Sequence, residues 1–373
     1  MSKMEQQVEQ HLDATLEQIL ELARWAPSGD NNQPWRFQII DARRLIVHGH
    51  DTRHHCVYDL DGHPSQISLG ALLETMAIAA STFGLAIDVR RHPEAPETHP
   101  TFTIDFVAAP AGVANALADV ILSRCVQRRA LSRRPLTPAE KAALAAALPP
   151  GYHITWLEGR QRLAAARLMF RNAKLRLTMP EAHPVHRAVI EWNARYSEDR
   201  IPDQALGVDA ITAKLMRWIM QDWRRVQFFN TWLAGTVAPR LQMDLIPGLA
   251  CAAHFVLTAD QPPRRIDDYL AAGRAMQRFW LKATALGLQL QPELTPLIFS
   301  RYVREGRVFS NTPGMHQRAA DLSRQGERLV GRQGWETAVF MGRIGAGAPA
   351  ASRSVRKPLR ELLVRPATPL EDR

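Results

Sequence analysis

The chain is organised around one segment, Ala26-Pro27-Ser28-Gly29-Asp30-Asn31-Asn32-Gln33-Pro34-Trp35-Arg36-Phe37. Before it, apolar residues recur at helical spacing over residues 16–23, and Pro27 ends that helix because proline lacks the N–H that the next turn needs. After it, the apolar run Phe37 to Ile40 predicts a strand. The Ser, Gly, Asp and Asn residues between them favour a bent loop with short polar side chains. Such a loop suits recognition of a flat, hydrogen-bonding ligand, and a plain helix-to-strand connection is the alternative.

The composition is that of an ordinary globular chain. Of its 373 residues, 46% are hydrophobic and 23% are charged, so a sizeable core is expected. No segment reaches the ~18 uninterrupted apolar residues of a membrane span, and Met1 to Gln10 lacks the basic and apolar parts of a secretory signal. The cysteines Cys56, Cys125 and Cys251 form no CxxC pair, so neither a disulfide framework nor a zinc site is expected. We therefore expect a cytoplasmic protein without a membrane partner.

The charge balance is strongly basic, with a net charge of +10. The arginines are dispersed and no nucleic-acid-binding motif is present, so a genome rich in Arg and Ala codons explains the charge better than nucleic-acid binding. The histidines His48, His50, His54 and His55 have no carboxylate or cysteine at ligand spacing on a shared helix face. We therefore expect no metal.

Two stretches of the chain repeat one pattern. An apolar segment from Ile67 to Leu85 predicts a buried helix ending at Gly84, with strands at 86–90 and 102–107. Further along, residues 113–126 predict a helix. Thr137-Pro138-Ala139-Glu140 is then a capped helix start, and it precedes predicted strands at 152–157 and 249–259. A second long helix, 267–288, ends at Gly287 before a last predicted strand at 337–344. A shift of 203 residues aligns Gly70, Ala80, Gly84 and Leu85 with Gly273, Ala283, Gly287 and Leu288, which indicates internal duplication.

The segment Ala-Pro-Ser-Gly-x-Asn-x-Gln-Pro-Trp-x-Phe resembles the signature of the nitroreductase family, the FMN-dependent oxidoreductases. In that family the loop lies against the flavin ring from across a subunit interface. The resemblance implies that Ser28, Gly29 and Asn31 contact the ring or ribityl chain, and that Gln33 belongs to the same cofactor-binding set.

An arginine-rich segment carries a second part of the resemblance. Arg128-Arg129-x-x-x-Arg133-Arg134-Pro135 is similar to the family's Arg-Arg-Ser-x-Arg segment, which holds the FMN phosphate. The match implies that Arg129 and Arg133 contact phosphate with Arg128 nearby, and the alternative is a solvated basic surface. The family's serine falls on Leu131, with Ser132 as the alternative source of a hydroxyl. In the tail, Arg356 and then Arg353 are the candidates for a basic contact to the same phosphate.

The two motifs lie in different parts of the chain, with the loop in the first and the arginines in the second. Each half retains what the other lacks, which resembles the Acg-like branch of the nitroreductase family, a fused pseudo-dimer with one complete site. We therefore expect an α+β, internally duplicated nitroreductase-like fold whose halves each hold a central sheet flanked by helices. The halves are residues 1–110 and 111–373, and the second includes a helical lid insertion at about 160–245 and a basic tail. Because the two halves supply the interface that a dimer normally provides, we expect a monomeric pseudo-dimer or a weak homo-oligomer.

The resemblance implies an FMN-dependent oxidoreductase that takes electrons from NAD(P)H and passes them to a small acceptor such as a nitroaromatic or a quinone. The flavin carries the chemistry, so no catalytic side chain is named. The alternative is a catalytically inactive FMN-binding or sequestering protein, in which the Trp- and Arg-rich block at 160–245 closes the substrate space. Bleaching of the bound flavin by NADPH separates the two.

Overall fold

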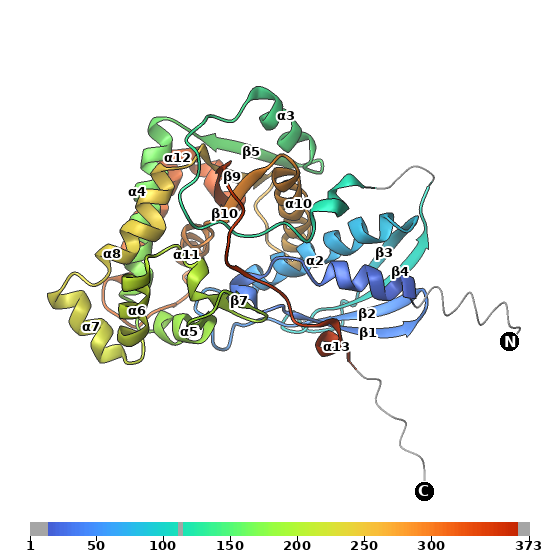
Figure 1. The fold of residues 1–373 in the computed structure, drawn as a ribbon, viewed down its shortest axis with the longest axis horizontal. Coiled ribbons are helices and arrows are strands. Elements are labelled where there is room, and N and C mark those ends of the chain that lie inside the picture. Colours follow the sequence, from blue (N-terminus) through green and yellow to red (C-terminus); the bar gives the residue numbers. More distant parts are fainter. Residues whose placement is uncertain (1–13, 111–114, 365–373) are drawn as a thin grey trace, which may run out of the picture.

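The computed structural model describes residues 14–110 and 115–364, and two four-stranded antiparallel sheets form its framework (Figure 1). The first sheet has the order β1 (Trp35–Asp41), β2 (Arg44–Gly49), β4 (Thr101–Ala108) and β3 (Leu85–Arg91). The second has the order β5 (Tyr152–Leu157), β9 (Ala253–Ala259), β11 (Ala338–Ala346) and β10 (Leu288–Pro292). Both sheets therefore follow one scheme, in which the first, second, fourth and third strands along the chain lie side by side.

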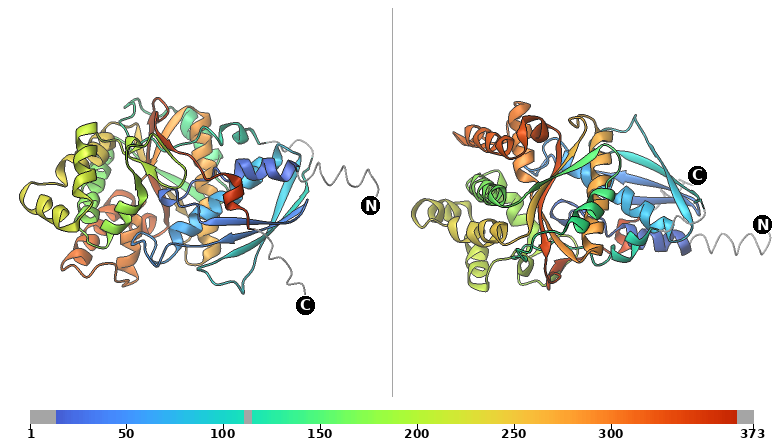
Figure 2. Two further views of the ribbon diagram at one scale, coloured as in Figure 1. Left: turned by 60° about the horizontal axis from the view of Figure 1, so that its bottom comes forward. Right: turned by 90° about the horizontal axis from the view of Figure 1, so that it is seen from above.

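A long helix stands at the same place in both schemes, between the second and third strands. These helices are α2 (His63–Ser81) and α10 (Ile266–Ala285), and they pack against each other between the two sheets (Figures 1 and 2). Each is followed by a glycine with left-handed backbone, Gly84 at φ 68° and Gly287 at φ 72°. The predicted buried helices and their glycine ends are confirmed.

The crossing of α2 and α10 depends on two glycines. A Cβ atom on Gly70 would overlap the backbone carbonyl of Leu270, and one on Gly273 would overlap that of Ile67. The absence of a side chain lets the two backbones approach directly. Their outer faces complete two separate cores, α2 with the first sheet and α10 with the second.

The predicted strands are confirmed as β1, β3, β4, β5, β9 and β11, and the capping box of α3 (Pro138–Ala146) is also confirmed. Strand β2 was not predicted, although its Leu45 and Val47 are fully buried. The predicted helix at 113–126 is wrong beyond residue 120, and residues 111–114 lie outside the described residues. Ala116–Val120 is a short 3-10 helix, and the chain then runs along the second sheet, where Gln127 N–H donates to Leu290 O at 3.0 Å. That tertiary pairing replaces the helical hydrogen bonds.

Two mostly helical segments lie between strands of the second sheet. Between β5 and β9 lies an insertion that is mostly helical. It also contains three two-residue strands and one 3-10 helix. Its elements are α4 (Arg160–Leu177), α5 (Ala182–Val189), β6 (Ile190–Glu191), β7 (Tyr196–Ser197), β8 (Ile201–Pro202), η3 (Asp203–Ala205), α6 (Ala210–Ile219), α7 (Trp223–Trp232), α8 (Val237–Arg240), the π-helix η4 (Leu241–Leu245) and α9 (Ile246–Leu249). Between β10 and β11 lie α11 (Thr295–Arg304) and α12 (Met315–Glu336).

The end of the described chain returns to the first sheet. We call residues 347–364 the C-terminal strap, which runs from β11 back to β1 (Figure 1). Its β12 (Arg353–Ser354) pairs in parallel with β7, and its α13 (Leu359–Leu362) packs beside β1, where Val364 N–H donates to Phe37 O at 2.8 Å. The strap thus joins the two sheets and the insertion.

Across residues 14–110 and 115–364, the structure contains no helix with the length and apolar character that crossing a membrane requires.

Candidate functional site

The loop after Pro27 has a strained backbone. Asp30, Asn31 and Gln33 have positive φ angles of 49°, 65° and 49°, a conformation that residues with a side chain rarely adopt. The loop is fixed from inside, because Ser28 Oγ accepts a hydrogen bond from Gln33 N–H at 3.0 Å and the indole of Trp35 is fully buried. Strain of this kind is concentrated at functional sites, where the surrounding structure holds it in place.

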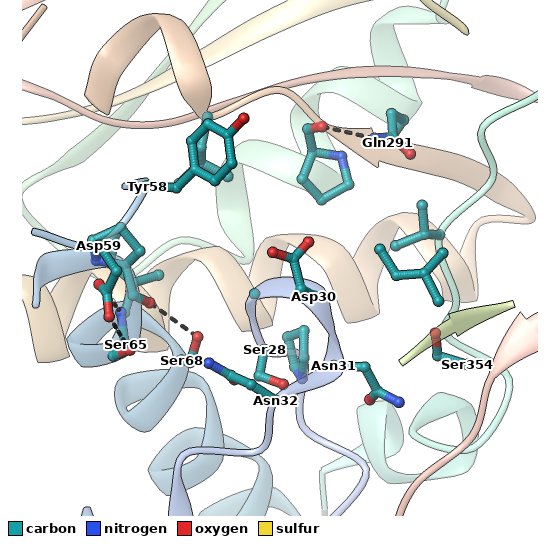
Figure 3. A pocket seen from close by; sticks show the side chains of 18 of the residues that line it. Ser28, Asp30, Asn31, Asn32, Tyr58, Asp59, Ser65, Ser68, Gln291 and Ser354 are labelled. Carbon is teal, nitrogen blue, oxygen red and sulfur yellow. Dashed lines mark hydrogen bonds between the residues drawn. The ribbon is translucent and has the colours of Figure 1, made fainter. Parts of the chain in front are cut away.

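A cavity of about 310 Å³ opens above this loop. Its walls come from every part of the fold: the loop itself, residues between 52 and 68, residues 124–128, the insertion, α10, the segment after β10, and the strap. Figure 3 shows Asp30 at the tip of the loop, with Tyr58 and Asp59 to one side and Ser354 to the other. The cavity therefore lies where the first sheet's loops meet the second sheet's.

Five of the eight predicted site residues line this cavity: Ser28, Gly29, Asn31, Arg128 and Arg356. Gln33 is fully buried beneath it instead. Its side-chain amide donates to Glu198 O at 2.7 Å and its Oε1 accepts from Lys357 N–H at 3.0 Å. Gln33 thus fastens the loop to the insertion and to the strap.

Arg129 and Arg133 are exposed and are not among the cavity-lining residues. Their expected contact with a phosphate stays a prediction. Arg128, in contrast, lines the cavity. Its side chain donates to Ala205 O at 3.4 Å, and its backbone carbonyl accepts from Arg343 at 2.8 Å. Burial lowers the pKa of Arg128 to about 10.

Three other arginines converge on one end of the cavity: Arg124, Arg353 and Arg356. Within the described chain their guanidinium groups form no ion pair and donate only to backbone carbonyls. Arg124 donates to Trp25 O at 2.6 Å, Arg353 to Leu122 O at 2.8 Å, and Arg356 to Ala26 O at 2.9 and 3.0 Å. Burial, together with Arg124 and Arg353, lowers the pKa of Arg356 well below its ordinary value. Like charges held together without a carboxylate would be stabilised by an anion.

Unpartnered polar atoms line the cavity as well. Among the described residues, six buried cavity-lining atoms have no hydrogen-bond partner: Nε of Arg124, Arg176 and Arg353, Oδ1 of Asn31 and Asn32, and Oε1 of Gln291. Buried polar groups in native proteins are almost always paired. The cavity therefore suits a polar ligand that both donates and accepts hydrogen bonds and carries negative charge at one end.

The opposite wall carries the polar side chains of Tyr58, His186 and Asp59. Tyr58 Oη and His186 Nε2 lie 2.7 Å apart and their rings stack, and burial lowers the pKa of His186 to about 3. Asp59 is held by Thr52 and Ser65, whose hydroxyls donate to it at 2.8 and 2.6 Å. No group of His, Cys, Asp or Glu within residues 14–110 and 115–364 is arranged to hold a metal ion.

A buried charged triad supports the cavity from behind. Glu293 accepts from Arg343 at 2.9 Å and lies 2.7 Å from His254, whose other nitrogen lies 2.9 Å from Gly248 O. All three side chains are at most 2% exposed. Because Arg343 also donates to the carbonyl of Arg128, the triad sets the path of the cavity-lining segment. Arg343 was not among the predicted site residues, so this role was not predicted.

Comparison with known proteins points to one family. Residues 12–60 match the model of the nitroreductase family, a span that includes the strained loop and part of the cavity wall. A nitroreductase-like family protein from Bacillus cereus aligns at 13% identity and a TM-score of 0.32, over 68% of this chain and 96% of that one. The FMN-dependent nitroreductase NfnB from Mycobacterium smegmatis, solved in complex with NADPH, aligns at 16% identity and a TM-score of 0.33, over 68% and 98%. No curated protein sequence matches the chain.

Proposed function

We propose that this chain is an FMN-dependent oxidoreductase that transfers electrons from NAD(P)H to a small acceptor such as a nitroaromatic or a quinone. One observation carries the proposal. The loop that matches the nitroreductase family lines a cavity in which six buried polar atoms lack partners within the described chain. A polar ligand with an anionic end satisfies those atoms, and FMN is such a ligand.

The residues present fit FMN. Arg124, Arg353 and Arg356 would hold the phosphate, because guanidinium groups match the geometry of a phosphate dianion. The free Oδ1 atoms of Asn31 and Asn32 would accept from the N–H group of the ring or from ribityl hydroxyls. Trp280 and Met276 of α10 supply apolar wall.

When bound, FMN supplies the redox chemistry, accepting electrons from the donor and delivering them to the acceptor. The protein's own contribution is to bind, orient and shield. The strained loop presents its side chains without freedom to move, and buried arginines favour negative charge in the cavity. No side chain is needed as a nucleophile.

We also propose that the chain is a fused pseudo-dimer of the Acg-like type, with halves at 1–110 and 111–373. The shared strand order, the crossing of Gly70 and Gly273, and the paired Gly84 and Gly287 support this. Walls from both halves support a single composite site in one chain. The insertion at about 160–245 would act as a lid, since it contributes Arg176 and His186 to the cavity. The cytoplasm is its proposed location.

The absorption spectrum of the purified protein, before and after anaerobic NADPH, tests the function. We expect a bound flavin whose visible band disappears when NADPH is added and returns when a quinone is added. A flavin that is bound but never bleached supports the alternative, a sequestering protein. Absence of flavin after reconstitution with excess FMN contradicts both.

A further inference from the structure

Two features make an aspartate unfavourable at position 30, namely the backbone conformation and the burial of the carboxyl group. Its backbone has φ 49° and ψ 19°, a left-handed conformation that glycine adopts far more readily. Its carboxyl projects from the loop tip into the cavity (Figure 3), where burial disfavours a charge. Among the described residues, no group donates a hydrogen bond to this carboxyl. An acid at this position stabilises neither the loop nor the core. We therefore infer that its side chain acts on a molecule bound in the cavity.

The groups around Asp30 suit an acid that gives up a proton. Arg128 and Arg176 face it from the second half, and Cys56 and Tyr58 face it from the first. Tyr58 is in turn paired with the neutral His186. Burial raises the pKa of Asp30, while Arg128 and Arg176 lower it. Burial thus keeps the proton in place, and the two arginines stabilise the carboxylate that remains once the proton has left.

We propose that Asp30 donates a proton to the electron acceptor in this cavity. This inference rests on the proposed function. A quinone takes up two electrons and two protons to become a hydroquinone, and a hydride delivers both electrons with one proton. The Asp30 carboxyl gives the remaining proton to a quinone oxygen, becomes a carboxylate beside Arg128 and Arg176, and regains a proton from water.

The variant Asp30→Asn removes the acid and keeps its shape, and asparagine tolerates a left-handed backbone. Stopped-flow absorbance separates the two half-reactions of the FMN-loaded protein. We expect bleaching by NADPH to change less than about twofold, and reoxidation by a quinone to slow by about 100-fold or more. In the parent, reoxidation slows as pH rises through the pKa of Asp30, and in the variant this dependence disappears. Asp88→Asn, exposed on β3, is the matched control with parental rates.

A second readout needs no turnover. Because the folded-state pKa of Asp30 is raised, its carboxylate destabilises the folded chain at high pH and not below its unfolded pKa. The gain in unfolding free energy of Asp30→Asn over the parent, without FMN, should therefore grow as pH rises, and that of Asp88→Asn should stay constant.

The outcomes are distinguishable. If NADPH fails to bleach the parent, the proposed function fails and the inference fails with it. If bleaching is intact and Asp30→Asn reoxidises at the parental rate, only the inference is overturned. Should Asp30→Asn not hold FMN, Asp30→Gly takes its place, and a flat pH profile of reoxidation in the parent is by itself sufficient to overturn the inference.

Discussion

At the scale of single residues, the cavity is marked by six buried polar atoms without a hydrogen-bond partner among the described residues, and by three clustered arginines without an ion pair there. Arg124 is distant in the sequence from Arg353 and Arg356. Arg124 and Arg356 donate to the carbonyls of Trp25 and Ala26 after the first helix, and the guanidinium of Arg353 lies over the ring of Trp25. Their Coulomb repulsion is unfavourable without an anion, which supports the proposal that this end of the cavity binds an anionic ligand. A phosphate would turn a destabilising cluster into a binding site.

Removing one of these arginines should affect FMN and spare riboflavin. In Arg124→Gln or Arg353→Gln, a charged hydrogen bond worth about 1.5–3 kcal/mol is lost. FMN affinity should therefore fall about 10- to 150-fold. Riboflavin has no phosphate, so its affinity should stay near the parental value. Titration of the apoprotein with each ligand, followed by protein fluorescence, measures both.

The matched controls are Arg129→Gln and Arg133→Gln, which remove exposed arginines outside the cavity lining. The cavity predicts parental FMN binding for both, whereas the family resemblance predicts weakening. If these controls lose FMN and the Arg124 and Arg353 variants keep it, the phosphate assignment belongs to the sequence motif instead.

The buried pair of His254 and Glu293 should make stability depend on pH. Burial opposes the charged imidazole, but Glu293 outweighs it and raises the pKa of His254 from 6.5 to about 10. The stabilisation is then complete below pH 6.5 and is lost as pH rises through about 10. His254→Gln removes a charged hydrogen bond from the buried Glu293, which keeps Arg343 as its partner, so we expect a loss of about 1.5–3 kcal/mol at pH 6.5 or below and a smaller loss at about pH 10.

Urea unfolding of parent and variant at the two pH values gives this difference. His153→Gln is the control, because His153 pairs with Asp260 at the surface and such pairs contribute less than about 1 kcal/mol. A loss for His254→Gln that is the same at both pH values would show that His254 does not stabilise the fold through its charge.

At the scale of elements, the crossing of α2 and α10 sets the relation between the two sheets. Both helices are buried, and their glycines bring backbone against backbone without intervening side chains. Small movements of this crossing would shift the loop above α2 against the wall formed by α10. The cavity's dimensions therefore depend on this contact.

Alanine at the crossing should destabilise the fold. In Gly70→Ala or Gly273→Ala the new methyl group overlaps a backbone carbonyl, which cannot move as a flexible side chain could. We expect a loss of about 1–3 kcal/mol or more, from overpacking. Gly334→Ala in α12 is the control, because its Cβ would lie 3.5 Å from Val330 and in ordinary contact. There we expect a gain of about 0.5–1 kcal/mol from helix propensity. Denaturant unfolding of the three variants measures these changes. Equal changes in unfolding free energy in all three would exclude a special role for the crossing.

Elements with a strong local signal could be predicted from sequence. Helix α2 has a long apolar run, α2 and α10 are each followed by a glycine, Gly84 and Gly287, and α3 has its own capping box. Strand β2 was missed because its apolar run, Leu45-Ile46-Val47, is only three residues long and stands between two arginines and a histidine-rich stretch. The helix expected at 113–126 was lost to backbone pairing with the second sheet, which no local pattern encodes.

The candidate site divides in the same way. The loop residues Ser28, Gly29 and Asn31 are contiguous, so the signature was enough to place them together. Arg124, Arg176 and His186 reach the cavity only through the folding of distant segments. Arg128 is half-buried and lines the cavity, whereas its neighbour Arg129 is exposed outside the cavity lining, although both belong to one arginine-rich run. Sequence spacing alone does not distinguish them.

At the scale of the whole molecule, one chain supplies both sides of one cavity. The loop and residues 52–68 lie before residue 110 in the chain, while residues 124–128, α10 and the strap lie after it. The strap crosses between the sheets and carries two of the three clustered arginines (Figure 1). A single chain therefore has everything that the proposed site requires, without a partner subunit.

The most direct test is a count of flavin on a chain of known oligomeric state. Size-exclusion chromatography with light scattering and absorbance gives the mass of the flavin-bearing species, and denaturation releases the flavin for identification. One FMN per chain, on a monomer that keeps it upon dilution, is the predicted result. Two flavins per chain, FAD in place of FMN, or flavin found only on a dimer and lost as it dissociates, would contradict a single composite site.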